Sequence, residues 1–191
     1  MSEPGFRPAE PSEVDTLVEV LTAAFHDDPV DRWIFPDPGR RRRAHPTFYA
    51  VLAEAAFAGG RIDVSDDLAA LVLWLPGGDE GLLDGFAALE ESEQDRLEAV
   101  FALLGEHIPA RPGYWQAQFA AVRPDRQRQG LGGGLFRYGL DRHDAAGSPT
   151  YLVASSPGSA RLYRRLGYRE LGAAFRLPGG SPLRPMWRDP S

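Results

Sequence analysis

Residues Val122–Phe136, "VRPDRQRQGLGGGLF", place four glycines within five positions, at the predicted junction of an apolar strand and a helix. A glycine inside a helix costs about 1 kcal/mol relative to alanine. A helix N-terminus, however, offers unpaired backbone N–H groups and a partial positive charge, and glycine lets phosphate oxygens approach that backbone. The stretch therefore predicts a phosphate-binding turn, with positive charge from Arg123, Arg126 and Arg128 beside it. The alternative is a flexible loop before an ordinary helix start.

Two common phosphate-binding motifs are excluded. A dinucleotide-binding G-x-G-x-x-G would need a glycine at position 135, where Leu135 stands. A Walker loop needs a lysine, and the chain contains none. The stretch instead matches Q-x-x-G-x-G, with Gln127, Gly130 and Gly132, between a predicted strand and a predicted helix.

The composition limits the classes of protein that the chain can represent. With 191 residues, 43% of them hydrophobic, it can form one domain with a substantial core. A net charge of −6 and a pI near 5.2 argue against a nucleic-acid partner. No cysteine is present and the four histidines show no ligand spacing, so we expect no metal. No apolar run approaches the ~20 residues of a membrane span, and the N-terminus lacks a signal peptide pattern, so we expect a cytoplasmic protein without a membrane partner.

Hydrophobic periodicity predicts a mixed α/β sheet in one domain. In the first half we expect a strand at 5–9, a helix at 11–25, a turn-rich connector at 26–39, a helix at about 40–58, a hairpin over 61–76 and a charged helical segment at 77–112. In the second half we expect a strand at 114–122, a helix at 130–145, a strand at 150–155, a short helix at 159–166 and two final strands. The strands on either side of helix 130–145 should be parallel, because a right-handed crossover joins them.

A second motif follows the glycine turn by about thirty residues. The segment "SSPGSARLYRRLGYRELG" contains L-Y-x-x-x-G-[FY], as Leu162, Tyr163, Gly167 and Tyr168. With the Q-x-x-G-x-G turn, this segment resembles the GNAT acyltransferase superfamily. The stretches "AFHDDPVDRWIFPDP", "YLVASSP" and "LPGGSPLRPMWRDP" resemble a bacterial branch that includes puromycin-type acetyltransferases. The resemblance spans most of the chain, apart from residues 77–112.

The resemblance implies a fold and a cosubstrate. The fold is α/β (α+β), with a mixed, mostly antiparallel sheet of about seven strands, helices on both faces and a parallel strand pair that splays apart at the cofactor site. Residues 1–191 would form a single acyl-CoA N-acyltransferase domain, in which the segment 77–112 shapes the acceptor side. Acetyl-CoA would place its pantetheine arm in the gap between the strands and its pyrophosphate on the turn. The implied cofactor-binding residues are Ala121, Val122, Gln127, Arg128, Gln129, Gly130, Leu131, Gly132, Gly133 and Ser159.

Tyr163 is the candidate catalytic residue. A phenol with a pKa of ~10 stays protonated at neutral pH and can donate to a thiolate whose acid has a pKa of ~8.5. The alternative is a core aromatic residue, which is how we interpret Tyr168. The family often has an asparagine where Ser159 stands, and this serine can either contact the cofactor or cap the helix.

The leading functional hypothesis is transfer of acetyl from acetyl-CoA to a primary amine of a small molecule. Without cysteine we expect no covalent enzyme intermediate, so the amine would attack directly in a ternary complex. The alternatives are a protein or peptide N-acetyltransferase and a non-catalytic acyl-CoA-binding module. We expect a monomer or a homodimer.

The acceptor side is less clear from the sequence. The amine must lose a proton, and the candidate bases are Glu106, His107, Asp27 and Asp28, each with the alternative of a solvated polar residue. Trp33 and Trp115 are candidates for lining the acceptor pocket, although aromatic residues in such segments are usually core.

Overall fold

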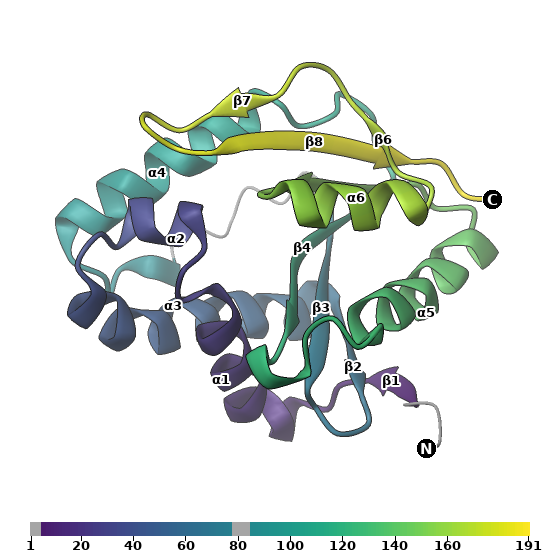
Figure 1. Ribbon diagram of the computed structural model, residues 1–191, viewed down its shortest axis with the longest axis horizontal. Coiled ribbons are helices and arrows are strands. Elements are labelled where there is room, and N and C mark those ends of the chain that lie inside the picture. The colour runs from purple at the N-terminus through teal and green to yellow at the C-terminus, as the bar shows by residue number, and fades with distance from the viewer. Residues whose placement is uncertain (1–4, 78–84) are drawn as a thin grey trace.

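Eight strands form one sheet in this computed structural model, which describes residues 5–77 and 85–191. The strands are β1 (Phe6–Pro8), β2 (Arg61–Ser65), β3 (Ala70–Pro76), β4 (Trp115–Val122), β5 (Thr150–Ala154), β6 (Arg169–Glu170), β7 (Phe175–Arg176) and β8 (Pro182–Arg188). Their order is β1-β2-β3-β4-β5-β8-β6, and β7 pairs with β8 (Figure 1). The pairing is antiparallel except between β4 and β5, which confirms the predicted fold class. The sheet has one strand more than expected, because the last segment contains two short strands, β6 and β7, and the longer β8.

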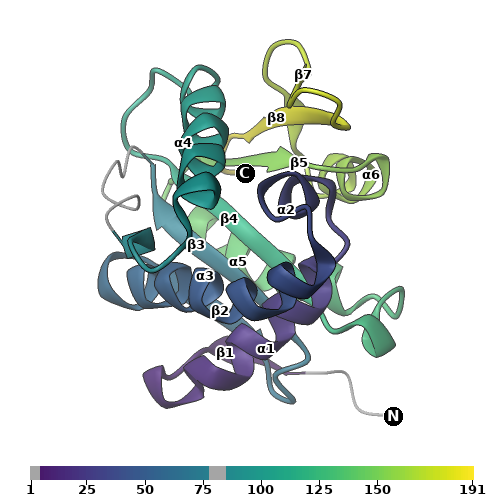
Figure 2. The same ribbon diagram turned by 90° about the vertical axis from the view of Figure 1, so that its left-hand side faces the viewer.

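Helices cover both faces of the sheet (Figures 1 and 2). They are α1 (Val14–Phe25), α2 (Pro29–Ile34), α3 (Pro38–Gly59), α4 (Glu91–Gly105), α5 (Leu131–Ala145) and α6 (Pro157–Arg165). Strand β3 shows how the two cores arise, since alternate side chains of a strand point to opposite faces. Leu71 and Leu73 enter the core with α1 and α3, whereas Val72 and Trp74 enter the core with α5. Among the helices so described, none is both long and apolar enough to cross a membrane.

The prediction of a turn-rich connector at 26–39 was wrong, because this segment contains α2. Asp28 is its N-cap: its Oδ1 accepts a hydrogen bond from the backbone N–H of Val30 at 2.8 Å. Pro29 occupies the first helical position, where the backbone N–H that proline lacks would have no acceptor within the helix. The Asp-Pro pair that suggested a turn is therefore a helix start. The expected helical segment 77–112 contains α4, and its residues 78–84 lie outside the described residues.

Two residue pairs are all that join β4 to β5. Trp115 pairs with Thr150 and Gln116 with Tyr151, and beyond them the strands diverge. At this point β4 has a bulge against β3: Trp74 lies opposite Ala117 and Leu73 opposite Phe119, which leaves Gln118 without a partner. A bulge bends its strand and increases the local twist, and this bend accounts for the splayed parallel pair that we predicted.

Helix α2 is fixed on α3 by a buried carboxyl group. Asp31 is 3% exposed, accepts a hydrogen bond from the hydroxyl of Tyr49, and has its Oδ2 3.3 Å from Nε2 of His45. Burial raises the pKa of Asp31 to about 8 and lowers the pKa of His45 to about 4. Both side chains are therefore mainly uncharged at neutral pH, which avoids the cost of a buried charge.

We predict that Asp31 makes the protein less stable as the pH rises. The folded protein binds this proton up to about pH 8, whereas the unfolded chain releases it near pH 3.8. Between these pH values the folded state binds more protons, so the free energy of unfolding should fall with pH by up to about 1.4 kcal/mol per unit from this group. Asp31→Asn keeps an acceptor for Tyr49 and should flatten the curve of stability against pH, measured by urea unfolding from pH 4 to 8. Asp27→Asn, at an exposed position, is the control. An Asp31→Asn protein with the wild-type pH slope would contradict the prediction.

Candidate functional site

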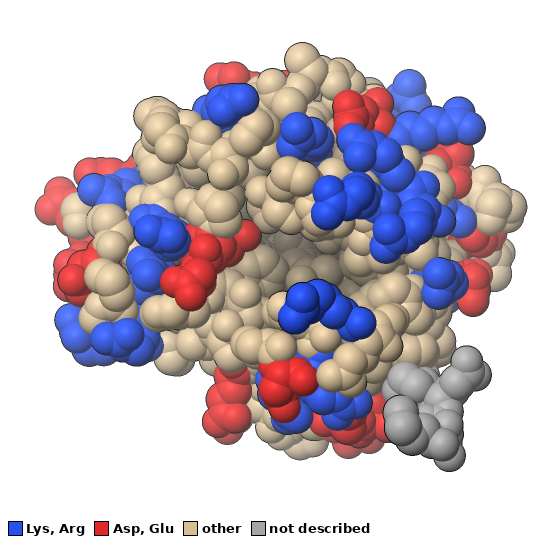
Figure 3. Space-filling model, in the orientation of Figure 1, with Lys and Arg blue, Asp and Glu red and all other residues tan. Residues whose placement is uncertain are grey.

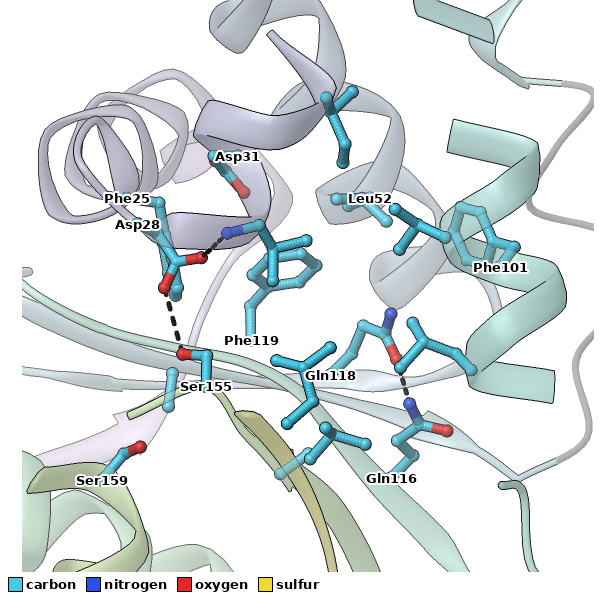
Figure 4. A pocket seen from close by; sticks show the side chains of 18 of the residues that line it. Phe25, Asp28, Asp31, Leu52, Phe101, Gln116, Gln118, Phe119, Ser155 and Ser159 are labelled. Carbon is cyan, nitrogen blue, oxygen red and sulfur yellow. Dashed lines mark hydrogen bonds between the residues drawn. The ribbon is translucent and has the colours of Figure 1, made fainter. Parts of the chain in front are cut away.

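A cavity of about 250 Å³ lies where β4 and β5 part (Figure 4). Its floor comes from the bulged part of β4, from Val153 on β5 and from Ser155 just after β5. Helices α1 to α4 supply the walls. The apolar lining residues include Phe25, Phe48, Leu52, Leu97, Val100, Phe101, Leu104 and Phe119. The segment that was expected to shape the acceptor side thus contributes four of these residues, all from α4.

The glycine-rich turn has the backbone geometry of an anion site. Arg128 and Gly130 both have a left-handed backbone, with φ of 61° and 86°, and a non-glycine residue in this region is uncommon. The first hydrogen bond of α5 runs from the N–H of Gly134 to the carbonyl of Gly130 at 3.0 Å. The N–H groups of Leu131, Gly132 and Gly133 precede that bond and therefore have no acceptor within the helix. They can donate to a phosphate group.

Gly133 and Gly134 differ in whether packing requires a glycine at that position. A Cβ on Gly134 would lie 2.8 Å from Cζ of Phe6, so this glycine is needed for packing against β1. A Cβ on Gly133 would meet only Cδ1 of Leu162, at an ordinary contact distance of 3.6 Å. Close packing thus explains Gly134 and does not explain Gly133.

Two of the three arginines beside the turn are paired with carboxylates. Arg126 lies 2.6 Å from Asp67, and Arg123 lies 2.7 Å from Asp125. Their charge is therefore largely compensated. Arg128 is exposed, at the end of the turn that leads into α5. In Figure 3 the surface is hollowed near its centre, between α6 and this turn, and arginine side chains lie on both sides of the hollow.

Two glutamine side chains donate hydrogen bonds to backbone carbonyls of the turn. The side-chain amide of Gln127 donates to the carbonyl of Val122 at 3.1 Å, and that of Gln129 donates to the carbonyl of Asp125 at 3.2 Å. Gln127 thereby ties the end of β4 to the start of α5. Ala121, next to Val122, pairs with Leu71 on the β3 side of β4. The opposite edge of β4 at this residue faces the gap toward β5.

Helix α6 places Ser159 and Tyr163 on the cavity, one helical turn apart. Ser156 is the N-cap, and it exchanges hydrogen bonds with Ser159: the N–H of Ser159 donates to Ser156 Oγ at 3.1 Å, and the N–H of Ser156 donates to Ser159 Oγ at 3.2 Å. Ser159 thus takes part in the cap while it lines the cavity. Burial raises the pKa of Tyr163 to about 12, which keeps its phenol protonated at neutral pH. Tyr168 lies in the core beside Phe136, in agreement with its interpretation as a packing residue.

Asp28 is a carboxyl group at the end of the cavity nearest α6. Its Oδ2 accepts a hydrogen bond from the hydroxyl of Ser155 at 3.0 Å, while its Oδ1 caps α2 (Figure 4). Burial raises the pKa of Asp28 above its usual range. A carboxylate with a raised pKa is a better proton acceptor.

Of the four candidate bases, Asp28 lines the cavity. Asp27 is exposed, and Glu106 and His107 lie beside a separate hollow near Leu171. The ring of His107 stacks on Phe175 with 3.8 Å between ring centroids, which gives it a packing role.

Trp33 and Trp115, the candidates for lining an acceptor pocket, are core residues, as the stated alternative predicted. Trp33 packs against the core of α1 and α3, and Trp115 packs against the core of α5, so neither lines the cavity. Asp31 and Ser155, which do line it, were missed. The i, i+3 spacing of Asp28 and Asp31 would place both on one side of a helix, but this signal is visible only once residues 29–34 are recognised as helical.

Comparison with known proteins finds one matching family model and several structures of the same fold. Residues 113–187 match the model of the GNAT acetyltransferase domain. The structure of a protein from Corynebacterium glutamicum described as "histone acetyltransferase HPA2 and related acetyltransferase" is similar over 100% of this chain and 98% of that chain, with 27% identity and a TM-score of 0.74.

Two more distant structures share the fold. The polyamine N-acetyltransferase of Drosophila melanogaster matches 98% of this chain and 100% of its own, with 16% identity and a TM-score of 0.68. A ribosomal-protein alanine N-acetyltransferase of Escherichia coli matches 99% of this chain and 95% of its own, with 18% identity and a TM-score of 0.59. Residues 113–187 therefore match a GNAT acetyltransferase domain, and the whole chain shares the fold of these solved acetyltransferases.

Proposed function

We propose that the protein is an N-acetyltransferase that moves the acetyl group of acetyl-CoA to the primary amine of a small molecule. The observation that carries this proposal is the parting of β4 from β5. It places the glycine turn, Tyr163 and a largely apolar cavity with a carboxyl group around one gap. Assignment to the branch that includes puromycin-type acetyltransferases stays a prediction.

The residues around the gap fit acetyl-CoA. The N–H groups of residues 128–133 would hold the pyrophosphate, since those that start α5 have no acceptor within the helix. The pantetheine arm would lie along Ala121 and Val122, and Ser159 lies on the opposite side of the gap, on α6. A backbone N–H of β4 would polarise the thioester carbonyl in the manner of an oxyanion hole.

The proposed reaction needs a base and an acid from this chain. Asp28 would take a proton from the ammonium group of the acceptor, whose nitrogen then attacks the thioester carbonyl. The new N–C bond forms as the C–S bond breaks, and Tyr163 would donate its phenolic proton to the departing sulfur. The acylated nitrogen then loses its second proton, which restores the phenol of Tyr163, and Asp28 releases the first proton to solvent. Proximity of the two substrates in one complex would supply much of the acceleration.

Two alternatives are less well supported. A protein or peptide acceptor, like that in the name of the Escherichia coli neighbour, needs an open groove, whereas helices α2 and α4 wall in a cavity of about 250 Å³. A non-catalytic acyl-CoA-binding module would have no need of a protonated tyrosine on the gap. We further propose a cytoplasmic monomer or homodimer that uses no metal. Within the described residues, no group of three or more potential metal ligands is found.

We predict that acetyl-CoA raises the melting temperature and that ATP and NAD do not. At a concentration of 100 times Kd the folded state gains about 2.7 kcal/mol, which corresponds to roughly 5–10 °C for a chain of this size. Gly133→Glu should weaken this effect at least about tenfold, because a carboxylate would meet the phosphate, although acids in the first turn of a helix favour the helix itself. Gly133→Gln, of the same size without the charge, is the control. Tight CoA binding by the Glu variant would contradict the assigned phosphate site.

We predict that Tyr163→Phe lowers kcat by about 10²-fold or more, because general acid catalysis contributes that much to such steps. Free-thiol release with acetyl-CoA and an accepted amine measures the rate. Tyr168→Phe also removes one buried phenol hydroxyl and should leave kcat within about twofold, since Tyr168 is a core residue away from the cavity. Unchanged turnover of Tyr163→Phe, with the CoA-dependent thermal shift intact, would show that another group protonates the thiolate.

A further inference from the structure

The cavity has a polar end and an apolar end. In Figure 4, Asp28, Ser155 and Ser159 lie at one side, and Phe101 and Leu52 lie at the other. The polar end adjoins α6, which carries Tyr163, so it is the end at which acetyl transfer would take place. The apolar end lies beneath α4, where Leu97, Val100, Phe101 and Leu104 line it.

Among the described lining residues, one carboxylate is available to bind a cation. Asp28 and Asp31 are the two acids among them. The carboxyl of Asp31 accepts the hydroxyl proton of Tyr49 and, with its pKa raised to about 8 by burial, is mainly neutral at pH 7. The side chains of Gln116 and Gln118 at the far end are uncharged amides, and Gln116 donates a hydrogen bond to Gln118. One carboxylate, Asp28, remains for an ammonium group.

We propose that the acceptor is a monoamine with an apolar body, whose ammonium group binds Asp28 and whose body lies beneath α4. This inference rests on the proposed function and names the substrate class of the same site. Ser155 acts as a positioning residue, because its hydroxyl fixes the carboxylate oxygen that points to the cavity.

The size of the cavity limits the body of this amine. The cavity of about 250 Å³ also borders the proposed position of the cosubstrate, so it suits an amine with a small body. 2-Phenylethylamine and n-hexylamine are of this size. Their bodies would displace water from apolar side chains, which is favourable.

A second positive charge would make binding worse. The far ammonium group of a diamine would lie among leucine and phenylalanine side chains and would lose hydration without gaining a carboxylate partner among the described lining residues. The site should therefore differ in preference from the polyamine acetyltransferase that shares its fold.

The decisive experiment compares n-hexylamine with 1,6-diaminohexane, which differ only by the second amine. We expect kcat/KM for acetylation of n-hexylamine and 2-phenylethylamine to exceed that of the diamine at least about tenfold, as burial of an unpaired charge requires. Equal or better use of the diamine would overturn the proposal.

Variants at the two ends of the cavity test the orientation. Asp28→Asn should weaken the binding of 2-phenylethylamine at least about tenfold in calorimetry with CoA present, because a charge-assisted hydrogen bond is lost. Asp27→Asn, which removes the same charge from the exposed neighbouring position, should change it less than about twofold. Phe101→Ala should raise KM for n-hexylamine and leave KM for ethylamine, which is too short to reach α4. Equal losses in the two aspartate variants, or a Phe101→Ala effect equal for both amines, would overturn the assigned orientation.

The CoA-dependent thermal shift distinguishes a failure of the proposed function from a failure of the proposed substrate class. If the wild-type protein shows no thermal shift with CoA, the proposed function itself is wrong, whichever amines bind. A normal thermal shift together with acetylation of diamines or peptides in preference to monoamines would overturn only the inference about the substrate class. Asp28→Asn should keep the thermal shift with CoA, which also shows that the variant is folded.

Discussion

The early end of the backbone pairing between β4 and β5 is the constraint on which the rest of the site depends. The two strands share two residue pairs, and the bulge at Gln118 then turns β4 away. A sheet that stayed paired to its end would bring the turn before α5 and the start of α6 against each other, with no gap between them. The divergence separates them and leaves Ser159 and Tyr163 of α6 on the cavity.

Helix α2 completes this space through one residue with two roles. Asp28 uses one carboxylate oxygen to cap α2 and the other to accept the hydroxyl proton of Ser155, which follows β5. The helix is therefore joined to the strand at which the sheet opens. On its other side, Asp31 joins α2 to Tyr49 of α3 as a neutral carboxyl group. The same short helix thus carries two acids: Asp31 is held by Tyr49 of α3, and Asp28 is bound to Ser155 after β5.

The fold was largely predictable because its signals are local in the sequence. The parallel pair, the helix after the glycine turn and the position of Tyr163 follow from patterns of fewer than about twenty residues. Helix α2 was missed because Asp28-Pro29 is equally typical of a turn and of a helix start, and only the packing against α3 decides between them. The compensation of Arg126 could not be predicted either, since Asp67 reaches the turn from the distant β2–β3 hairpin.

The acceptor side depends on contacts that no single segment reveals. The phenylalanines of the cavity come from α1, α3, α4 and β4, and in the sequence each resembles an ordinary core residue. They line a cavity only because β4 diverges from β5 beneath them. The glycines of the opening stretch show the same limit at a smaller scale. Gly134 is required by Phe6, more than a hundred residues earlier, whereas Gly133 has room for a Cβ. A helix that begins with both is therefore shaped partly by packing and partly by the phosphate that we propose it binds.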